Sequence, residues 1–308
     1  MRATIALALL LAAPAAAQSG AAPFTVAESG RGFGSLSEAV AAIGDGDGTI
    51  VIAPGTYRDC ATQSAGRVTY RAATPGSVIF DGGICDGKAT LVLNGRGSSV
   101  EGLIFRNLRV ADGNGAGIRA EKGDLNVDNS MFLDSQEGIL GANDTPQRIT
   151  IDHSTFAGLG QCDETPDCAH SIYLANQGQI SVTNSRFERG RGGHYVKVRT
   201  PNIRVLDNSF DDTAGRKTNY MIDLSEGGTG RIAGNTFVQG ASKENWSAMI
   251  VVAAEGRTYG AAGLQVEGND ARLAPGAKNT SFVADLSKQP LAIGANKLGA
   301  GIRPFEQR

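Results

Sequence analysis

Apolar and polar residues alternate along this chain in short segments that recur at similar intervals. Five segments share a pattern in which alternating apolar residues run into a small polar turn and then a phenylalanine. They read LNVDNSMF, ITIDHSTF, ISVTNSRF, IRVLDNSF and GRIAGNTF, and they end at Phe132, Phe156, Phe187, Phe210 and Phe237. The spacings of these phenylalanines are 24, 31, 23 and 27 residues, and segments 264–271 and 291–298 are weaker copies. Strict alternation over so few residues predicts a β-strand in each copy.

A second short apolar segment precedes each copy. These segments are 117–121, 138–142, 171–175, 195–199, 220–225, 248–252 and 281–286. Each repeat therefore holds at least two strands, and no segment of useful length between them has a helical period. Such a unit cannot bury an apolar face alone, so the repeats must stack into a solenoid. A propeller is the alternative, but its blades usually need about forty residues.

Stacked repeats place equivalent residues in columns. Four asparagines share one phase of the repeat, namely Asn208, Asn235, Asn269 and Asn296. At the strand spacing of about 4.8 Å their amides can form a hydrogen-bonded ladder, and we expect His153 to replace an asparagine in it. The five phenylalanines should stack inside the solenoid in the same way. We interpret both columns as structural.

The composition agrees with many sharp turns and excludes several classes of protein. The chain of 308 residues contains 42 glycines, about twice the ordinary frequency, without the period of collagen. Its 29 basic and 31 acidic residues nearly balance, which argues against a nucleic-acid partner. With 41% hydrophobic residues, the chain is also not disordered by composition.

The first residues have the pattern of a signal peptide. Arg2 precedes an apolar run over 5–11, and small alanines follow at 15–17. We therefore expect a signal peptide over 1–17, a mature domain over 18–308, and a periplasmic or secreted protein. The apolar run is too short to span a bilayer, and no second run of spanning length occurs, so we expect no membrane span.

The four cysteines agree with export. An even number of cysteines in an exported chain indicates disulfides. We predict the pairs Cys60–Cys85 and Cys162–Cys168 because each closes a local loop. Three connectivities are formally open, and free buried thiols are the alternative.

The N-terminal region strengthens the solenoid prediction. Segment 24–43 reads FTVAESGRGFGSLSEAVAAI and is followed by TIVIAPGTYRD over 49–59. This resembles the opening of pectinesterases and their relatives, in which a short helix caps the first coil. Ser35 or Ser37 could cap such a helix. The buried face of the helix would hold Leu36, Ala39, Val40 and Ile43.

The whole chain is similar to the right-handed parallel β-helix proteins of the pectin-lyase-like superfamily. This resemblance implies an all-β fold with an N-terminal cap over 24–48, coils over 49–298 and a C-terminal tail over 299–308. The superfamily includes lyases, hydrolases, esterases, epimerases and inert adhesins, so the fold alone does not give the activity.

A cluster of polar residues follows from aligning the second segments. We expect their inward positions to be Ile118, Ile139, Ile172, Val196, Ile222 and Ile250. The next residue then points outward, which brings Tyr173, Lys197 and Asp223 together on neighbouring coils. Arg199 lies two residues beyond Lys197 on the same face, about 6.5 Å away. Two residues before the inward positions stand His170, His194 and Tyr220.

This cluster predicts an acidic glycan as partner and β-elimination as chemistry. A lyase must neutralise a uronate carboxylate, remove the neighbouring proton and protonate the leaving oxygen, and Lys, Arg, His and Tyr can do this. The pattern is similar to β-helical alginate lyases, which implies Lys197 as the base and Arg199 as the acid or the carboxylate-binding residue. Tyr173, His170 and His194 are then candidate proton donors or substrate contacts.

Further residues are candidates for binding. Asp223 and Glu226 could orient Lys197 or hold Ca²⁺, as carboxylates do in pectate lyases; no other cofactor is expected. We expect additional substrate contacts from Arg119, Tyr220, Asn245 and Trp246. Trp246 could stack on a sugar ring or close the edge of the solenoid. We expect a monomer.

Other interpretations stay open at this point. The histidines could serve only to fix turns, and Lys197 could form a surface salt bridge with Asp223, which would contribute little. A non-catalytic carbohydrate-binding or envelope protein is one alternative function. A hydrolase or epimerase that uses Asp223 with Asp211 or Glu226 is another. Pectinesterase and polygalacturonase motifs are absent, and the Asp211–Asp212 pair is expected in a solvated loop.

Overall fold

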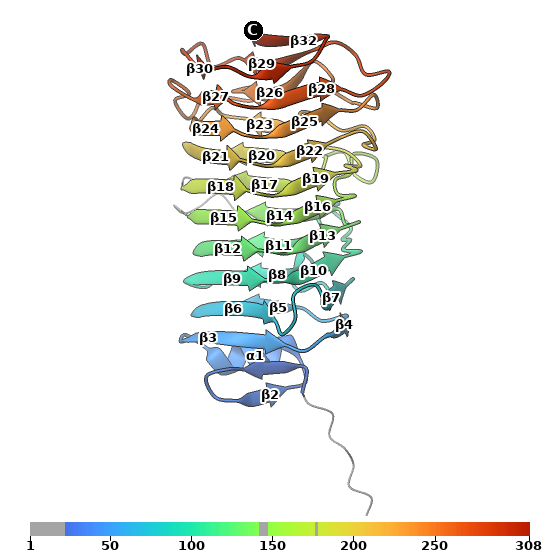
Figure 1. Cartoon of the computed structure of the whole chain (residues 1–308). Helices are drawn as coiled ribbons and strands as arrows, with labels where there is room; N and C mark the ends of the chain where they lie inside the picture. The colour runs from blue at the N-terminus through green and yellow to red at the C-terminus, as the bar shows by residue number, and fades with distance from the viewer. Residues whose placement is uncertain (1–21, 142–146, 176–177) are drawn as a thin grey trace, which may run out of the picture.

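The strands stack into one solenoid. The computed structural model describes residues 22–141, 147–175 and 178–308, and the expected signal peptide over 1–17 lies outside these ranges. Within them, successive coils follow one another along a single axis from the N-terminal to the C-terminal end (Figure 1). The prediction of an all-β parallel β-helix with a short N-terminal helix is confirmed.

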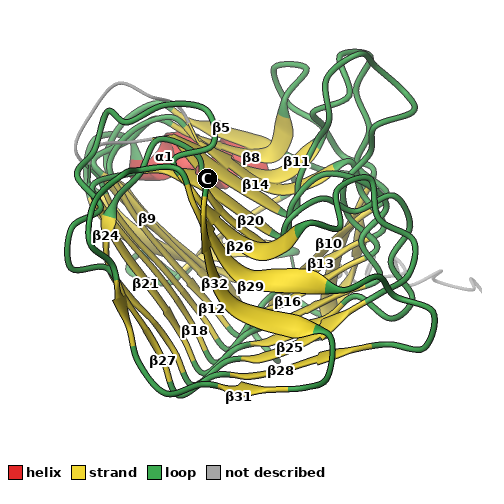
Figure 2. Cartoon of the chain, turned by 90° about the horizontal axis from the view of Figure 1, so that it is seen from above, coloured by secondary structure: helices red, strands yellow, loops and turns green. Residues whose placement is uncertain are grey.

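The described strands form three sheets, which we call A, B and C, around a common core (Figure 2). Sheet A contains β2 (Arg31–Phe33), β1 (Phe24–Val26), β3 (Asp47–Ile52), β6 (Arg67–Ala72), β9 (Gly97–Glu101), β12 (Asp124–Asp128), β15 (Arg148–Asp152), β18 (Gln179–Thr183), β21 (Asn202–Leu206), β24 (Thr229–Ala233), β27 (Gln265–Glu267) and β30 (Ala292–Ile293). Sheet B contains β4 (Gly55–Tyr57), β7 (Val78–Asp81), β10 (Leu103–Arg106), β13 (Met131–Leu133), β16 (Thr155–Ala157), β19 (Arg186–Glu188), β22 (Ser209–Asp211), β25 (Thr236–Gln239), β28 (Asp270–Leu273) and β31 (Lys297–Leu298). Sheet C contains β5 (Ala61–Gln63), β8 (Ala89–Leu93), β11 (Ala116–Ala120), β14 (Glu137–Gly141), β17 (Ile172–Ala175), β20 (Val196–Arg199), β23 (Ile222–Leu224), β26 (Ala248–Val252), β29 (Thr280–Asp285) and β32 (Ile302–Gln307).

Each recurring segment of the sequence supplies two of these strands. Its alternating apolar part lies in sheet A, and its phenylalanine lies in the following strand of sheet B, after a sharp turn. The phenylalanine rings stack as predicted: the centroids of Phe132 and Phe156 are 4.8 Å apart, and those of Phe210 and Phe237 are 4.9 Å apart. The column extends toward the N-terminus through Phe105. The apolar alternation thus fills one continuous core.

The predicted register of sheet C is confirmed. Ile139 pairs with Ile172, Ile172 with Val196, and Val196 with Ile222, and all of these side chains are fully buried. The residues that follow them therefore share a column on the outer face. In that column Tyr173 pairs with Lys197 and Lys197 with Asp223.

The asparagine ladder lies in the turns between sheets A and B. The amide of Asn208 donates to Asn235 Oδ1 at 3.0 Å, that of Asn235 to Asn269 Oδ1 at 3.0 Å, and that of Asn269 to Asn296 Oδ1 at 2.8 Å. Each ladder residue stands two positions before the phenylalanine of its repeat or its equivalent.

The expectation that His153 belongs to this ladder is wrong. His153 stands three positions before Phe156, where the backbone is left-handed, with φ 44°. The ladder position of this coil is Ser154, whose backbone N–H donates to Ser185 Oγ. The imidazole of His153 is instead 63% exposed and lies 2.8 Å from Asp152 Oδ2.

The N-terminal cap forms as its sequence predicts. Helix α1 (Leu36–Ile43) is capped by Ser35 in a capping box with Glu38. Leu36, Ala39 and Val40 face the core. Strand β1 pairs antiparallel with both β2 and β3, in contrast to the parallel pairing of the coils. The described residues contain no helix that is long and apolar enough to cross a membrane.

Both predicted disulfides, Cys60–Cys85 and Cys162–Cys168, are present. The expected C-terminal tail over 299–308 is wrong, because β32 pairs in parallel with β29 and extends sheet C. This strand was not predicted from the sequence, because its apolar alternation is short and is interrupted by Pro304.

Candidate active site

A cleft lies on the outer face of sheet C, at the middle of the solenoid. Its volume is about 760 Å³, and its floor comes from β11, β14, β17 and β20. Loops that lead from sheet B into sheet C line one side, and the loop after β26 lines the other. The cleft brings together six of the predicted residues: His170, Tyr173, His194, Lys197, Arg199 and Arg119.

His170 and His194 form a buried pair. The backbone N–H of His194 donates to His170 Nδ1 at 3.0 Å, and the two Nδ1 atoms are 3.3 Å apart. Because His170 Nδ1 accepts the backbone hydrogen, a neutral His170 carries its proton on Nε2, and His194 can donate from its own Nδ1. Burial lowers the pKa of His170 to about 3. Burial, His170 and Lys197 hold the pKa of His194 well below its ordinary value, so both rings are neutral at neutral pH.

Asp223 is in contact with His194 of this pair. Its Oδ2 is 3.5 Å from His194 Nε2 and accepts a hydrogen bond from Ser225 Oγ at 2.8 Å. The side chain is almost fully buried. Burial raises the pKa of Asp223 to about 6, although Lys197 and Ser225 oppose this rise. Asp223 can therefore hold or release a proton close to neutral pH.

Lys197 and Arg199 stand side by side over an aromatic ring. The Tyr173 centroid is 5.2 Å from Lys197 Nζ and 5.3 Å from Arg199 Cζ. Their anionic partner is Glu255, from the loop after β26: Oε1 is 2.5 Å from Lys197 Nζ, and Oε2 is 2.5 Å from an Arg199 guanidinium nitrogen. The alternative of a surface salt bridge between Lys197 and Asp223 is thus wrong. Lys197 is only 8% exposed, and its carboxylate partner is Glu255.

A second buried carboxyl, Glu137, extends the histidine column. Glu137 precedes the inward Ile139 by two residues, as His170 precedes Ile172. It is 1% exposed, and the backbone N–H of His170 is the hydrogen-bonding group that faces its carboxyl. Burial raises its pKa well above the ordinary value, despite the opposing effect of Arg119. Burial therefore favours the protonated form of the Glu137 carboxyl.

Comparison with known proteins agrees with this architecture. The family model described as "Right handed beta helix region" matches residues 90–271, which include the floor of the cleft. The chain belongs to the right-handed β-helix family. The predicted handedness is thereby confirmed, and the pectin-lyase-like resemblance agrees with the match. Neither the curated proteins nor the solved structures include a significant match.

Some predicted residues of this β-helix lie outside the cleft lining. The Tyr220 ring is 5.9 Å from that of His194, and Asn245 donates to the Tyr220 hydroxyl at 2.6 Å, so Tyr220 lies next to the histidine pair and Asn245 is linked to the pair through Tyr220. Trp246 is 41% exposed and contacts Lys278, whose Nζ is 4.9 Å from the ring centroid. The structure therefore does not bring Trp246 together with the polar cluster.

The expectation of a solvated Asp211–Asp212 loop is wrong for Asp212. Asp212 is fully buried and accepts hydrogen bonds from the Tyr195 and Thr218 hydroxyls, each at 2.8 Å. Lys243 Nζ is 3.2 Å from Asp212 Oδ2, and the Lys243 side chain is only 1% exposed. Asp211 lies on β22 of sheet B, away from Asp223 on sheet C, so these two cannot form a catalytic pair.

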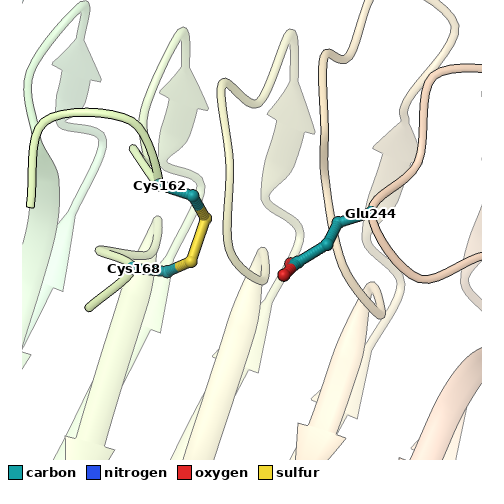
Figure 3. Close-up of side chains that lie close together, drawn as sticks. All are labelled: Cys162, Cys168 and Glu244. Atoms are coloured by element: carbon teal, nitrogen blue, oxygen red, sulfur yellow. A yellow bond between two sulfur atoms is a disulfide. The ribbon is translucent and has the colours of Figure 1, made fainter. Parts of the chain in front are cut away.

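Asp223 and Glu226, the carboxylates that could hold Ca²⁺, do not belong to a common group of potential metal ligands among the described residues. Glu226 Oε1 lies 3.5 Å from Arg199, and Asp223 faces His194, so the two carboxylates have separate partners. Among the described residues, Cys162, Cys168 and Glu244 form the group of potential ligands that lies beside the cleft. Figure 3 shows Glu244 directed toward the Cys162–Cys168 disulfide. Both sulfurs are bonded to each other and cannot act as thiolate ligands.

Glu255 and Glu137 were not predicted from the sequence. The signal for Glu137 was present, since its offset from Ile139 equals that of His170 from Ile172. Glu255 follows β26 by three residues, much as Glu226 follows β23 by two. However, only the fold of the loop shows which of the two reaches Lys197.

Proposed function

We propose that this β-helix protein is an exported polysaccharide lyase that cleaves a uronate-containing glycan by β-elimination. The observation that carries the proposal is the adjacent pair Lys197 and Arg199, both bound to one carboxylate on the floor of an open cleft. Such a pair can bind a sugar carboxylate. Neutralising the negative charge of that carboxylate makes the proton on the neighbouring C5 more acidic. The two disulfides support an oxidising compartment.

The proposed reaction assigns a role to each group around the pair. Arg199 binds the uronate carboxylate. Once the substrate has displaced Glu255, Lys197 loses its own proton to solvent and, as the uncharged amine, takes the C5 proton. The C5–H electrons form the C4–C5 double bond while the C4–O bond breaks. Tyr173 donates its phenolic proton to the leaving oxygen; burial raises its pKa, so it carries that proton at neutral pH. The uncharged histidines form the wall of the cleft beside Lys197.

The first test is an activity assay on a panel of uronate polysaccharides. Cleavage by elimination creates unsaturated chain ends, which absorb in the ultraviolet. We expect Lys197→Met to lower kcat by about 10²- to 10⁴-fold, as loss of a general base does, and Arg199→Met to act mainly on KM. Lys297→Met removes a charge from an 84% exposed side chain on sheet B and should leave activity unchanged. Full activity of Lys197→Met would refute the proposed mechanism.

A glycan-binding protein without turnover is the second candidate. It is favoured by the engagement of Lys197 with Glu255, which occupies the proposed base. This function predicts that glycans bind but no unsaturated ends form. Calorimetric titration beside the activity assay separates the two functions.

A further inference from the structure

Glu255 is held in the way that a ligand carboxylate would be held. Each of its oxygens contacts a different cation, Lys197 Nζ and Arg199, at 2.5 Å. Two hydrogen bonds from fixed cationic donors to the two oxygens of one planar carboxylate are a typical mode of carboxylate recognition. The aromatic ring of Tyr173 fixes both donors from below.

The backbone directs Glu255 into this place. Ala253, at the end of β26, has a left-handed conformation with φ 61°, which costs an alanine roughly 1 kcal/mol. The loop then hydrogen-bonds to the neighbouring coil: the N–H groups of Glu255 and Gly256 donate to Ser225 O at 2.8 and 3.1 Å. The turn at Ala253 and the hydrogen bonds to Ser225 O together direct the carboxylate of Glu255 toward Lys197 and Arg199 on β20.

The two sides of the contact differ in burial. The side chain of Lys197 is 10% exposed and that of Arg199 28%, whereas that of Glu255 is 39% exposed. Glu255 can therefore turn into solvent without opening the core, while the cations stay in place. Burial opposes ionisation of Glu255, but the hydrogen bonds from Lys197 and Arg199 outweigh it and lower its pKa.

We infer that Lys197, Arg199 and Tyr173 form a subsite for one sugar carboxylate, and that Glu255 occupies this subsite in the free protein until a uronate displaces it. The inference rests on the proposed function for the class of ligand, and it extends it by naming an internal competitor. It requires that a ligand carry an ionised carboxylate, so a neutral sugar or a uronate methyl ester does not displace Glu255.

The test measures binding without turnover. Galacturonate, glucuronate and mannuronate monosaccharides contain no glycosidic bond, so the protein cannot cleave them, and NMR titration gives their affinities. We expect Glu255→Gln and Glu255→Ala to bind at least one of these uronates about three- to tenfold more tightly than the unaltered protein, since they remove a competing ion pair. The methyl esters should show no such gain. Glu226→Gln is the matched control. It also removes a negative charge beside Arg199, but it leaves Glu255 in the place where the sugar carboxylate would bind.

Three outcomes would overturn the inference. These are no gain in affinity for either Glu255 variant, an equal gain for Glu226→Gln, or an equal gain for the methyl esters. The result is independent of lyase activity. Tighter uronate binding without polymer cleavage would support the subsite and refute the lyase, whereas cleavage with unchanged affinities would do the reverse.

Discussion

Asp223 shows how a single buried carboxyl can make stability depend on pH. Its folded pKa of about 6 lies above the value of 3.8 for an exposed aspartate, so between these values the folded protein binds more protons than the unfolded chain. Stability from this group is therefore fully present below about pH 4 and decreases as the pH rises through about 6. The charged and titratable groups around it are His194, Lys197, Arg199 and Glu255.

We expect Asp223→Asn to remove this dependence. At about pH 4 the variant should be close to the unaltered protein in stability, and at about pH 7 it should be more stable by up to about 3 kcal/mol. Denaturant unfolding at both pH values measures the difference. The control variant Asp270→Asn, in which the altered side chain is 40% exposed, should show no comparable gain. A stability difference for Asp223→Asn that is equal at both pH values would contradict the assigned burial effect.

The buried pair of Asp212 and Lys243 makes a second prediction at this scale. Lys243 also donates to the carbonyl of Asn219, and Asp212 holds the hydroxyl of Tyr195, so the pair fixes turns beside His194. Lys243→Met leaves a buried carboxylate without its cation and should lower the free energy of unfolding by about 3–5 kcal/mol. The exposed Lys297→Met should cost less than about 1 kcal/mol. Equal costs would show that Asp212 is solvated, as the sequence analysis expected.

The strands themselves were largely predictable, because their pattern has a physical period. Inward residues such as Ile172 and Val196 recur with the same neighbours, so their alignment gave the register of sheet C and the column of Tyr173, Lys197 and Asp223. The strands of sheet B, which have two to four residues, are too short to show alternation, and in the five clear repeats only the phenylalanine after each turn marked them. His153 was misplaced by one residue for the same reason, since a turn has no period to align.

The asparagine ladder allows a test at the level of the turn between sheets A and B. Asn235 is 1% exposed; its amide donates to Val205 O at 2.8 Å, and its Oδ1 accepts from the backbone N–H of Asn208 at 2.9 Å. Asn235→Ala leaves these buried groups unpaired, at about 1–3 kcal/mol each. We expect the free energy of unfolding, measured with denaturant, to fall by about 2 kcal/mol or more. Asn296→Ala, at the partly exposed end of the ladder, should lose less, and an equal loss would argue against the ladder as a cooperative element.

On the scale of the whole molecule, the cleft joins loops that the sequence separates widely. The loop with Cys162 and Cys168 leads into β17 of sheet C. Glu255 comes three coils later, in the loop that follows β26. Loop conformations of this kind depend on specific hydrogen bonds to neighbouring coils rather than on a repeating pattern. For this reason the column of polar residues could be predicted, but the partner of Lys197 could not.

The last described strand protects an open end of the solenoid. β32 covers the edge of β29, whose six residues are all buried. β32 itself carries Pro304, Arg303 and Glu306, which are the kinds of residue that prevent a further strand from pairing. Its neighbour Arg308 donates to the carbonyl of Ser247 at 3.0 Å and anchors this end.

Deletion of residues 302–308 should therefore expose the β29 edge and its apolar residues. We expect the shortened protein to self-associate at concentrations where the unaltered protein does not, and to unfold at a lower temperature, because an unpaired edge offers free N–H and C=O groups to another chain. Light scattering after size exclusion, together with a thermal melt, measures both effects. Replacing Pro304 with Val keeps the strand but restores an N–H donor at its edge, so this variant should fold normally and associate only weakly. A shortened protein that keeps the original size and melting temperature would show that β32 contributes nothing to closing the solenoid.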